Sequence, residues 1–232
     1  MNRIGIIGAM EIEIKSLVEK LENKTTRVAA GVEYNEGILA GHEVVIARSG
    51  VGKVNAAICT QNMITLFGAE AIINTGVAGS LNPAIDIGDI VLSTDVVHHD
   101  VDATVFGYAK GQIPQMKEFS FKSDAGLRDA AQRICCAVNP DIHVFQGRIC
   151  SGDRFVSDQQ TKDMIRETFD GMAVELEAAS IGQAAYLNGV PFLIVRAISD
   201  KADGSAEMDY DTFEAAAAEH GMRLTLGLLQ CL

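Results

Sequence analysis

The sequence contains no apolar stretch that approaches the roughly 20 residues needed by a membrane-spanning helix. Only four prolines occur in 232 residues, and no linker, internal repeat or low-complexity tract divides the chain. With 48% hydrophobic residues, this length predicts a single domain over residues 1–232 with one large core. The first residues, MNRIGIIGAMEIEI, have acids close to a short apolar run and no cleavage site, so we expect no signal peptide and a cytoplasmic protein.

Basic residues are also scarce, since 19 Lys and Arg stand against 31 Asp and Glu, giving a formal net charge of -12. An acidic surface repels nucleic acids and anionic membranes, so we expect neither as a partner, while small uncharged or cationic ligands remain open. The five cysteines are odd in number and form no CxxC, which favours reduced, packed thiols. No further His or Cys lies at zinc-like spacing around His98 and His99, and we expect neither a metal nor a cofactor.

Two glycine-rich segments resemble nucleotide-binding loops but lack essential residues. Segment 49–53, SGVGK, follows Ala47 where a phosphate loop needs glycine, and precedes Val54 where it needs a magnesium-binding Ser or Thr. Segment 5–8, GIIG, lacks the third glycine and the spacing of a dinucleotide-binding fingerprint. Both segments are interpreted as tight turns with close backbone packing.

What the sequence has is a regular alternation of apolar strands and amphipathic helices. We expect strands at residues 3–7, 71–75, 90–97, 142–149, 172–176 and 191–198, and two or three more between 25 and 48. We expect helices at residues 11–21, 53–66, 125–138, 158–169, 178–187 and about 210–229, and an irregular segment at 98–121. This alternation predicts an α/β fold, a three-layer α/β/α sandwich whose central sheet is mixed and largely parallel.

Polar residues collect where the predicted strands end. Segment 191–203, PFLIVRAISDKAD, begins as a buried strand and then turns polar at Ser199 and Asp200, which by themselves could also be a helix-capping pair. Four predicted loops, each following a strand, carry further candidate residues, at positions 9–13, 76–79, 151–156 and 175–177. Because ligands bind at strand ends in open α/β sheets, we expect these five segments to face one cleft.

Seven motifs occur in the order typical of one enzyme family and span nearly the whole chain. They are IGIIGAMEIE (4–13), SGVGKVNAA (49–57), NTGVAGSL (74–81), HDVDATVFGY (99–108), SGDRFV (151–156), VELEAA (174–179) and VRAISDKAD (195–203). On these motifs the chain resembles the 5'-methylthioadenosine/S-adenosylhomocysteine nucleosidases, within the wider nucleoside phosphorylase superfamily. Each motif alone is a weak signal, but seven in order are a strong one. The resemblance implies a nucleoside phosphorylase-like fold and a homodimer.

The resemblance also implies hydrolysis of the N-glycosidic bond of an adenine nucleoside. Because the adenine anion is a poor leaving group, a neutral carboxylic acid should protonate it as the bond lengthens. The resemblance assigns the protonation of adenine N7 to Asp200, and desolvation at the end of an apolar strand favours the neutral acid. Glu13 matches the glutamate that activates the water attacking an oxocarbenium-like ribose, while Glu11 is expected to be a solvated charge.

Three further charged residues are expected near the ribose. Glu177 matches the residue that binds the ribose hydroxyls, since an ionised carboxylate accepts two hydrogen bonds; the alternative is an exposed acid at a helix start. Glu175 alternates with Glu177 along VELE, so both can point to the same side of an extended segment. Arg196 is expected to orient Glu13 or the water, because a charge in so apolar a run needs a buried partner.

The remaining expected contacts surround the base and the 5' substituent. Phe155 would stack on adenine and the main chain of Val156 would bind its Watson–Crick edge, with Phe155 as an ordinary core residue the alternative. The other expected substrate contacts are Val77, Gly79, Leu176, Ser199 and Tyr210. The resemblance further implies that a neighbouring subunit contributes Phe106, Tyr108 and Pro114 to the 5'-alkylthio pocket, because an exposed aromatic segment is what a dimer interface hides.

Three residues depart from the family pattern. Val77 stands where bacterial hydrolases of this family commonly have Ser, Leu176 replaces a Met beneath the sugar, and Tyr210 replaces a Phe of the 5' pocket. The exchange at Leu176 conserves volume and should be mild. Tyr210 adds a polar group beside the 5' substituent, so the preference among methylthio, homocysteinyl, deoxy and futalosine-type substrates stays open.

Two other functions remain as alternatives. A phosphorylase of the same superfamily needs cationic or backbone N–H partners for phosphate, whereas the amino-terminal loop offers Glu11 and Glu13 and no arginine. A nucleoside-binding protein without catalysis would keep Phe155 and Glu177 but would have no need of Asp200 and Glu13. Hydrolysis is therefore the expected reaction.

Overall fold

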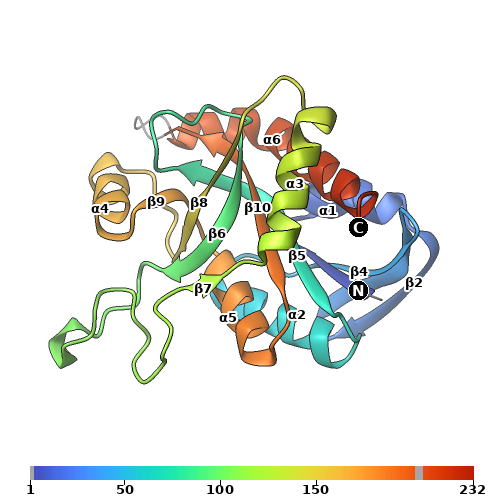
Figure 1. Cartoon of the computed structure of the whole chain (residues 1–232), viewed down its shortest axis with the longest axis horizontal. Coiled ribbons are helices and arrows are strands. Elements are labelled where there is room, and N and C mark those ends of the chain that lie inside the picture. Colours follow the sequence, from blue (N-terminus) through green and yellow to red (C-terminus); the bar gives the residue numbers. More distant parts are fainter. Residues whose placement is uncertain (1–2, 202–205) are drawn as a thin grey trace.

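A single sheet with helices on both faces runs through the computed structural model, which describes residues 3–201 and 206–232 and no side chain at 206–212 (Figure 1). The strands are β1 (Arg3–Gly8), β2 (Glu22–Ala29), β3 (Val32–Leu39), β4 (His42–Arg48), β5 (Ala71–Ser80), β6 (Ile90–His98), β7 (Phe121–Lys122), β8 (Val144–Ser151), β9 (Gly171–Glu175) and β10 (Phe192–Asp200). The helices are α1 (Glu11–Glu19), α2 (Lys53–Thr65), α3 (Ala125–Val138), α4 (Gln159–Phe169), α5 (Ala178–Asn188) and α6 (Ala206–Leu229). The predicted α/β fold is confirmed.

The sheet is mixed, and part of it closes on itself. The strand order is β10-β6-β8-β9-β5-β1-β4-β3-β2, with β7 beside β6. Because β10 also pairs with β5, the strands β5, β10, β6, β8 and β9 form a closed ring. Within this ring the last residues of β5 pair with the last part of β9, Gly79 with Val174 and Ser80 with Ala173, and β10 runs parallel to β5 on its other side. Polar residues of three strands therefore meet at one place.

Strands β5 and β10 lie side by side in the ring and are buried along their whole length. Their apolar, β-branched runs suit strands that are covered on both faces. The sequence predicted that β5 would end at Thr75 and become a loop at 76–79, which was wrong. The glycines there allow close packing between strands instead of making a turn, since Gly76 pairs with Arg196 and Gly79 with Asp200.

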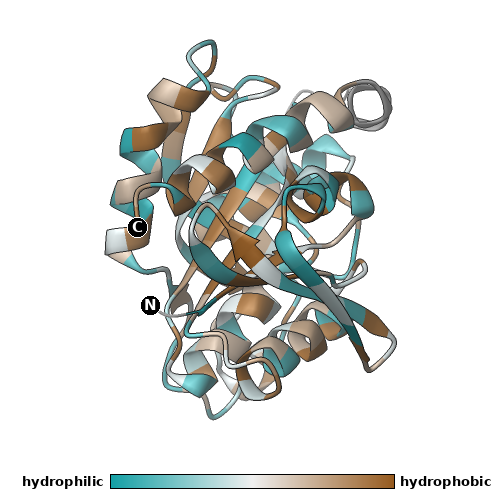
Figure 2. Ribbon diagram, turned by 90° about the vertical axis from the view of Figure 1, so that its right-hand side faces the viewer, coloured by the Kyte–Doolittle hydropathy of each residue, from teal (hydrophilic) through white to brown (hydrophobic). Residues whose placement is uncertain are grey.

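The helices form two layers, and each layer buries its own core against the sheet. Helices α1, α3 and α6 pack on one face, while α2 and α5 pack on the other. Figure 2 shows apolar residues concentrated in the strands between the two helical layers. Side-chain caps fix where two of the helices begin, since Asp124 accepts a hydrogen bond from the backbone of Leu127 and Asp158 accepts one from Thr161. Helix α6 begins at Ala206, four residues before the predicted start.

Two segments project from this body. The hairpin of β2 and β3 carries an almost fully exposed, charged strand β2 at the edge of the sheet, which discourages pairing with other chains. The segment between β6 and β7 extends away from the helices and contains a short 3-10 helix at Thr104–Phe106 (Figure 1). In the described part of the chain, every helix is too short or too polar to cross a membrane.

Candidate active site

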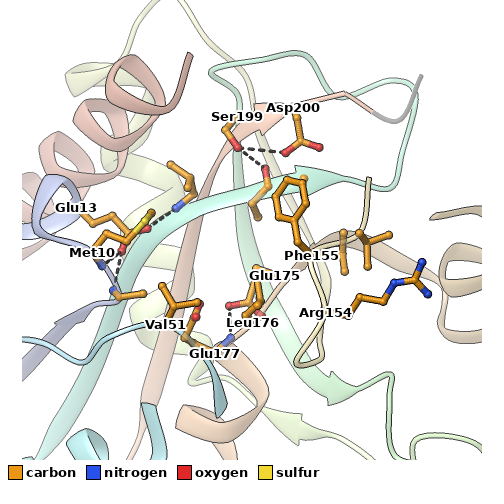
Figure 3. Close-up of a pocket in the computed structure, with 16 residues that line it drawn as sticks. Met10, Glu13, Val51, Arg154, Phe155, Glu175, Leu176, Glu177, Ser199 and Asp200 are labelled. Carbon is orange, nitrogen blue, oxygen red and sulfur yellow. Dashed lines mark hydrogen bonds between the residues drawn. The ribbon is translucent and has the colours of Figure 1, made fainter. Parts of the chain in front are cut away.

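The five polar segments expected to share a cleft do line one cavity, of about 370 Å³. Its lining residues come from the α1 start, the turn before α2, the end of β5, the loop before α4, the end of β9 and the end of β10: Ala9, Met10, Glu13, Val51, Val77, Ala78, Gly79, Arg154, Phe155, Val156, Val174, Glu175, Leu176, Glu177, Ser199 and Asp200. Figure 3 shows Glu13 on one side of this cavity, Asp200 on the opposite side, and Glu175 and Glu177 below them. A cavity of this size suits a small ligand such as a nucleoside.

Glu13 is held at the start of α1 by backbone groups. Its Oε2 accepts hydrogen bonds from the N–H groups of Ala9 at 2.6 Å and Met10 at 2.9 Å, and its Oε1 accepts one from Val77 at 3.0 Å. The side chain is buried, whereas Glu11 on the same helix is exposed, as expected. Burial raises the pKa of Glu13 above its ordinary value, against the opposing effects of Arg196 and the three backbone donors. A buried carboxylate with a raised pKa is a suitable general base.

Arg196 lies beneath the cavity and is not among its lining residues. Its Nη2 donates to Glu175 Oε2 and to Asn74 Oδ1, both at 2.6 Å, and lies 4.0 Å from Glu177 Oε2. Desolvation lowers the pKa of Arg196, but the surrounding carboxylates of Glu175, Glu13 and Glu177 together raise it above the ordinary value. The prediction that Arg196 would orient Glu13 or the water was incomplete, because its closest carboxylate is Glu175.

Glu175 is the member of this group that is fully engaged within the protein. Its Oε2 accepts hydrogen bonds from the backbone N–H groups of Glu177 at 3.0 Å and Ala178 at 2.8 Å, in addition to Arg196. Its Oε1 accepts one from the hydroxyl of Ser151. These contacts fix the end of β9 against the start of α5, and both Glu175 and Glu177 line the cavity.

Glu177 is buried at the position just before α5, so the alternative of an exposed helix-start acid was wrong. Its Oε1 accepts a hydrogen bond of 2.8 Å from the backbone N–H of Gly52. Burial, followed by the nearby charge of Glu175, raises the pKa of Glu177 to about 8. At neutral pH this carboxyl group is therefore mostly protonated.

Asp200 is the last residue of β10 and is buried there, six residues before the first residue of α6. Its Oδ2 forms an ion pair of 2.9 Å with Nζ of Lys162, and its Oδ1 accepts a hydrogen bond of 3.2 Å from Ser199 Oγ. Gly79 makes room for this carboxyl group, because a Cβ atom at Gly79 would lie 2.8 Å from Asp200 Oδ2. Asp200 is thus fixed from three sides while it lines the cavity.

The loop between β8 and α4 forms the side of the cavity next to Asp200 (Figure 3). Phe155 is 45% exposed there, which rules out an ordinary core residue, while Val156 beside it is buried. A network of charges ties this loop to the turn before α2. The ammonium group of Lys53 contacts Asp100 at 2.7 Å. The backbone N–H of Lys53 donates a hydrogen bond of 2.9 Å to the side chain of Asp153, and the backbone N–H of Asp153 donates one of 3.0 Å to the side chain of Asp100.

This network also explains the SGVGK segment that resembles a phosphate loop. Its Gly50 and Gly52 have positive φ angles of 83° and 98°, as expected of a tight turn. The N–H of Gly52 binds Glu177 and the ammonium group of Lys53 binds Asp100, so both groups that would contact a phosphate already have carboxylate partners. The segment serves to position Glu177 and the loop that carries Phe155.

Besides Arg196, three expected residues do not line this cavity. Phe106, Tyr108 and Pro114 lie in the projecting segment and do not line the cavity of their own chain. The side chain of Tyr210 lies outside the described residues. His98 and His99 are buried, and burial lowers the pKa of both. The described residues contain no cluster of three or more His, Cys, Asp or Glu that could hold a metal ion, and the absence of a metal stays a prediction.

Sequence analysis missed Lys162 altogether. One signal was present, since Lys162 lies three and seven residues before Ile165 and Phe169, and all three are buried on one face of α4. A lysine in this register of an apolar face needs a buried acidic partner, and Asp200 is that partner. Asn74 and Ser151 were also missed, since nothing local marks a strand residue that binds Arg196 or Glu175.

Comparisons with known proteins agree with this geometry. Residues 3–230 match the family model of the phosphorylase superfamily. The 5'-methylthioadenosine/S-adenosylhomocysteine nucleosidase of Bacillus cereus strain G9842 is 42% identical over 229 residues, which cover 98% of each chain.

Solved structures give the same picture. The Neisseria meningitidis 5'-methylthioadenosine/S-adenosylhomocysteine nucleosidase, in complex with methylthio-immucillin-A, superposes with a TM-score of 0.95 at 42% identity and covers 100% of both chains. The futalosine hydrolase of Helicobacter pylori superposes with a TM-score of 0.94 at 31% identity, covering 100% of this chain and 98% of the other. The chain therefore belongs to the 5'-methylthioadenosine/S-adenosylhomocysteine nucleosidase family of the phosphorylase superfamily.

Proposed function

We propose that this protein hydrolyses the N-glycosidic bond of 5'-methylthioadenosine and S-adenosylhomocysteine, giving adenine and the 5-thio-ribose product. The observation that carries this proposal is the placement of Asp200 and Glu13 on opposite sides of one cavity, with Glu177 between them (Figure 3). Family members at 42% identity carry this activity in their names, and one is solved with methylthio-immucillin-A bound.

Asp200 acts as the general acid in this proposal. Its carboxyl O–H bond breaks as a bond from hydrogen to adenine N7 forms, and the electron pair of the breaking C1'–N9 bond passes into the purine. The leaving group is then neutral adenine instead of its anion, which is worth about 10² to 10⁴ in rate for a well-placed acid. Phe155 would stack on the departing base from the loop beside Asp200.

Glu13 acts on the opposite side as the base that receives a proton from the attacking water. The ribose left behind has oxocarbenium character, and carboxylates close to a developing cation stabilise it. The raised pKa of Glu13 supports its role as a proton acceptor near neutral pH. Glu177 would accept hydrogen bonds from the ribose hydroxyls, and Arg196, which pairs with Glu175, lies 4.0 Å from Glu177 Oε2.

Water is the better nucleophile for this site than phosphate. The lining residues include four carboxyl groups, those of Glu13, Glu175, Glu177 and Asp200, and one cation, Arg154. Arg154 pairs with Asp158 at 2.9 Å and points away from the cavity in Figure 3. A phosphate dianion would therefore meet negative charge without a free cation among these residues, which disfavours phosphorolysis.

Hydrolysis is tested by the group that becomes attached to C1 of the sugar when adenine leaves. Purified protein in phosphate-free buffer should release adenine from 5'-methylthioadenosine, and in water labelled with oxygen-18 the label should appear at C1 of the sugar product. Adenine release that requires phosphate and gives a sugar 1-phosphate would identify a phosphorylase. Binding of the nucleoside without adenine release would identify a non-catalytic member of the superfamily.

We also propose that the protein is a homodimer in which Phe106, Tyr108 and Pro114 complete the 5' side of the partner's cavity. Phe106 is 80% exposed on the projecting segment, and apolar side chains of α2 and α5, such as Ile58 and Leu187, are exposed on the molecule's surface. Exposed apolar groups of this kind are typical of an interface. Sedimentation should give the mass of a dimer, and Phe106→Ala should raise KM for both thioether substrates.

The dimer is the one macromolecular assembly in this proposal, since the net charge of -12 disfavours nucleic acids and anionic membranes as partners. A cytoplasmic location is also proposed, and five free cysteines support it, because free thiols are typical of reducing compartments. Fractionation of cells that express the tagged protein would test the location.

A further inference from the structure

Lys162 and Asp200 form an ion pair from which water is excluded. Lys162 Nζ lies 2.9 Å from Asp200 Oδ2, and the two side chains are 1% and 2% exposed. The same ammonium group donates a hydrogen bond to the backbone carbonyl of Lys201. Desolvating two charges is costly, and the attraction between them does not always repay that cost. A pair of this kind at the wall of a catalytic cavity therefore suggests a role in the reaction.

The position of Lys162 is set by the element that also borders the base. Helix α4 follows the loop of Phe155 and Val156, and its buried residues Ile165 and Phe169 pack in one cluster with Val156. Lys162 lies on the same buried face, so its ammonium group is fixed relative to that loop. The loop and the cation that contacts Asp200 thus belong to one packed unit.

The contacts of Lys162 distinguish the two oxygens of Asp200. Oδ2 contacts the ammonium group of Lys162. It also lies close to Gly79, since a Cβ atom added at Gly79 would be 2.8 Å from Oδ2. Oδ1 accepts a weaker hydrogen bond of 3.2 Å from Ser199 Oγ. Asp200 lines the cavity and Lys162 does not, so the lysine holds the carboxyl group without occupying space that the substrate needs.

We propose that Lys162 is a positioning residue for Asp200, which fixes Oδ2 so that Oδ1 faces purine N7. This inference rests on the proposed function, in which Asp200 is the general acid. In the reacting complex Asp200 carries a proton from solvent on Oδ1, while Oδ2 stays in contact with Lys162. When this proton passes from Oδ1 to N7 and the C1'–N9 electron pair passes to the purine, Asp200 becomes a carboxylate. The ammonium group of Lys162 then stabilises that new negative charge, and the acid regains its proton from water after adenine leaves.

The test compares Lys162→Met with Arg166→Met, which removes a cation one turn further along α4 that pairs with Asp163 at the surface. We expect Lys162→Met to lower kcat for 5'-methylthioadenosine by about 10- to 100-fold, with KM changed less than about threefold. Arg166→Met should keep kcat within about twofold, as is usual for an exposed pair. Wild-type kcat in Lys162→Met would overturn the proposal.

A second measurement separates positioning from a merely structural role. The 7-deaza analogue of the substrate has a C–H group where N7 would accept the proton, so its affinity does not depend on the orientation of Asp200 Oδ1. We expect its Kd to be the same in Lys162→Met and wild type within about twofold. A Kd that weakens in parallel with kcat would mean that the cavity itself is disturbed, and would overturn the proposal.

A double-mutant cycle shows whether Lys162 acts through Asp200. In the Asp200→Asn background, Lys162→Met should cause no further loss of kcat, and a further loss equal to that of the single variant would contradict the proposal. Full turnover by Asp200→Asn alone would instead refute the acid assigned in the proposed function. If Lys162→Met does not fold, Lys162→Gln, which keeps a donor but removes the charge, is tested by the same two measurements, and wild-type kcat there overturns the proposal.

Discussion

The two sides of the cavity arrange charge in opposite ways. Near α1 and β9, the three buried carboxyl groups of Glu13, Glu175 and Glu177 surround one guanidinium group, that of Arg196. At the end of β10, the carboxyl group of Asp200 pairs with the ammonium group of Lys162. The first side has more acids than cations and retains protons, whereas the second is balanced as an ion pair.

This difference explains how one residue type serves two roles in the proposed reaction. Crowded, desolvated carboxyl groups bind protons readily, and burial accordingly raises the pKa of Glu13 and raises that of Glu177 to about 8. They suit a base, a binder of hydroxyl groups and a stabiliser of positive charge. A cation fixed beside a carboxyl group stabilises the carboxylate that forms when the proton leaves, which suits the proposed acid. Substitutions on the two sides should therefore have separable effects.

The largest expected effect is that of Asp200→Asn. The amide has nearly the same shape but no acidic proton, so kcat for 5'-methylthioadenosine should fall by about 10² to 10⁴-fold. Nucleoside binding should remain measurable, because the other lining residues are unchanged. Adenine release followed by absorbance gives kcat, and a variant with full turnover would show that adenine leaves without this acid.

Glu13→Gln tests the opposite side and should lower kcat by about 100-fold, since water then attacks without a base. Glu11→Gln is the matched control, because Glu11 is on the same helix two residues earlier and is exposed. It removes the same charge outside the cavity and should leave kcat within about twofold. Equal activity of the Glu13 and Glu11 variants would show that water is activated elsewhere.

Much of this comparison was predictable from the sequence because its residues stand at strand ends. Glu13, Glu175, Glu177 and Asp200 each follow or end an apolar strand, and the sheet brings such ends together. The alternation of strands and helices fixed their approximate positions, and the order of motifs fixed the family. Both kinds of information are local in the sequence or carried by resemblance.

The sequence did not predict which side chains these residues contact across the ring of strands. The register of Lys162 on α4 marks it as buried, but Lys162 is 38 positions before Asp200 and no local pattern identifies Asp200 as its partner. The contact of Arg196 with Glu175 depends on the pairing of β5 with both β10 and β9, which places the ends of these two strands on either side of β5. Strand order and long-range pairing are not encoded in periodicity.

Substitution of two glycines should have a smaller effect, on stability. Each of these glycines leaves space for charged side chains on one side of the cavity. A Cβ atom at Gly76 would lie 2.5 Å from Glu13 Oε1 and 2.9 Å from Arg196 Nη1, whereas one at Gly79 would lie 2.8 Å from Asp200 Oδ2. Gly76→Ala should therefore cost about 1 to 3 kcal/mol of unfolding free energy, and Gly79→Ala less. Denaturant unfolding measures both, and a larger loss at Gly79 would contradict this ranking.

The smallest expected effect is a pH dependence of substrate affinity, which arises from the side of the cavity with Glu13, Glu175 and Glu177. Glu177 is faced by Glu175, Glu13, Arg196 and the N–H of Gly52, and its pKa is raised to about 8. Since the ionised form accepts both ribose hydroxyls, binding should release a proton below that pH. The ionised fraction rises from about one-tenth at pH 7 to about one-half at pH 8, so affinity should increase about fivefold over that interval.

Calorimetry with the 7-deaza analogue measures this proton directly, because that ligand takes up none at position 7. In buffers of different ionisation enthalpy, binding at pH 7 should release about 0.9 proton, and the release should vanish well above pH 8. A ligand without the 2' and 3' hydroxyls should release none, and neither should Glu177→Gln with the intact ligand. Lys162→Met should leave the release unchanged, because it alters the opposite side. Proton release that disappears in Lys162→Met but persists in Glu177→Gln would reverse the assignment of the two sides.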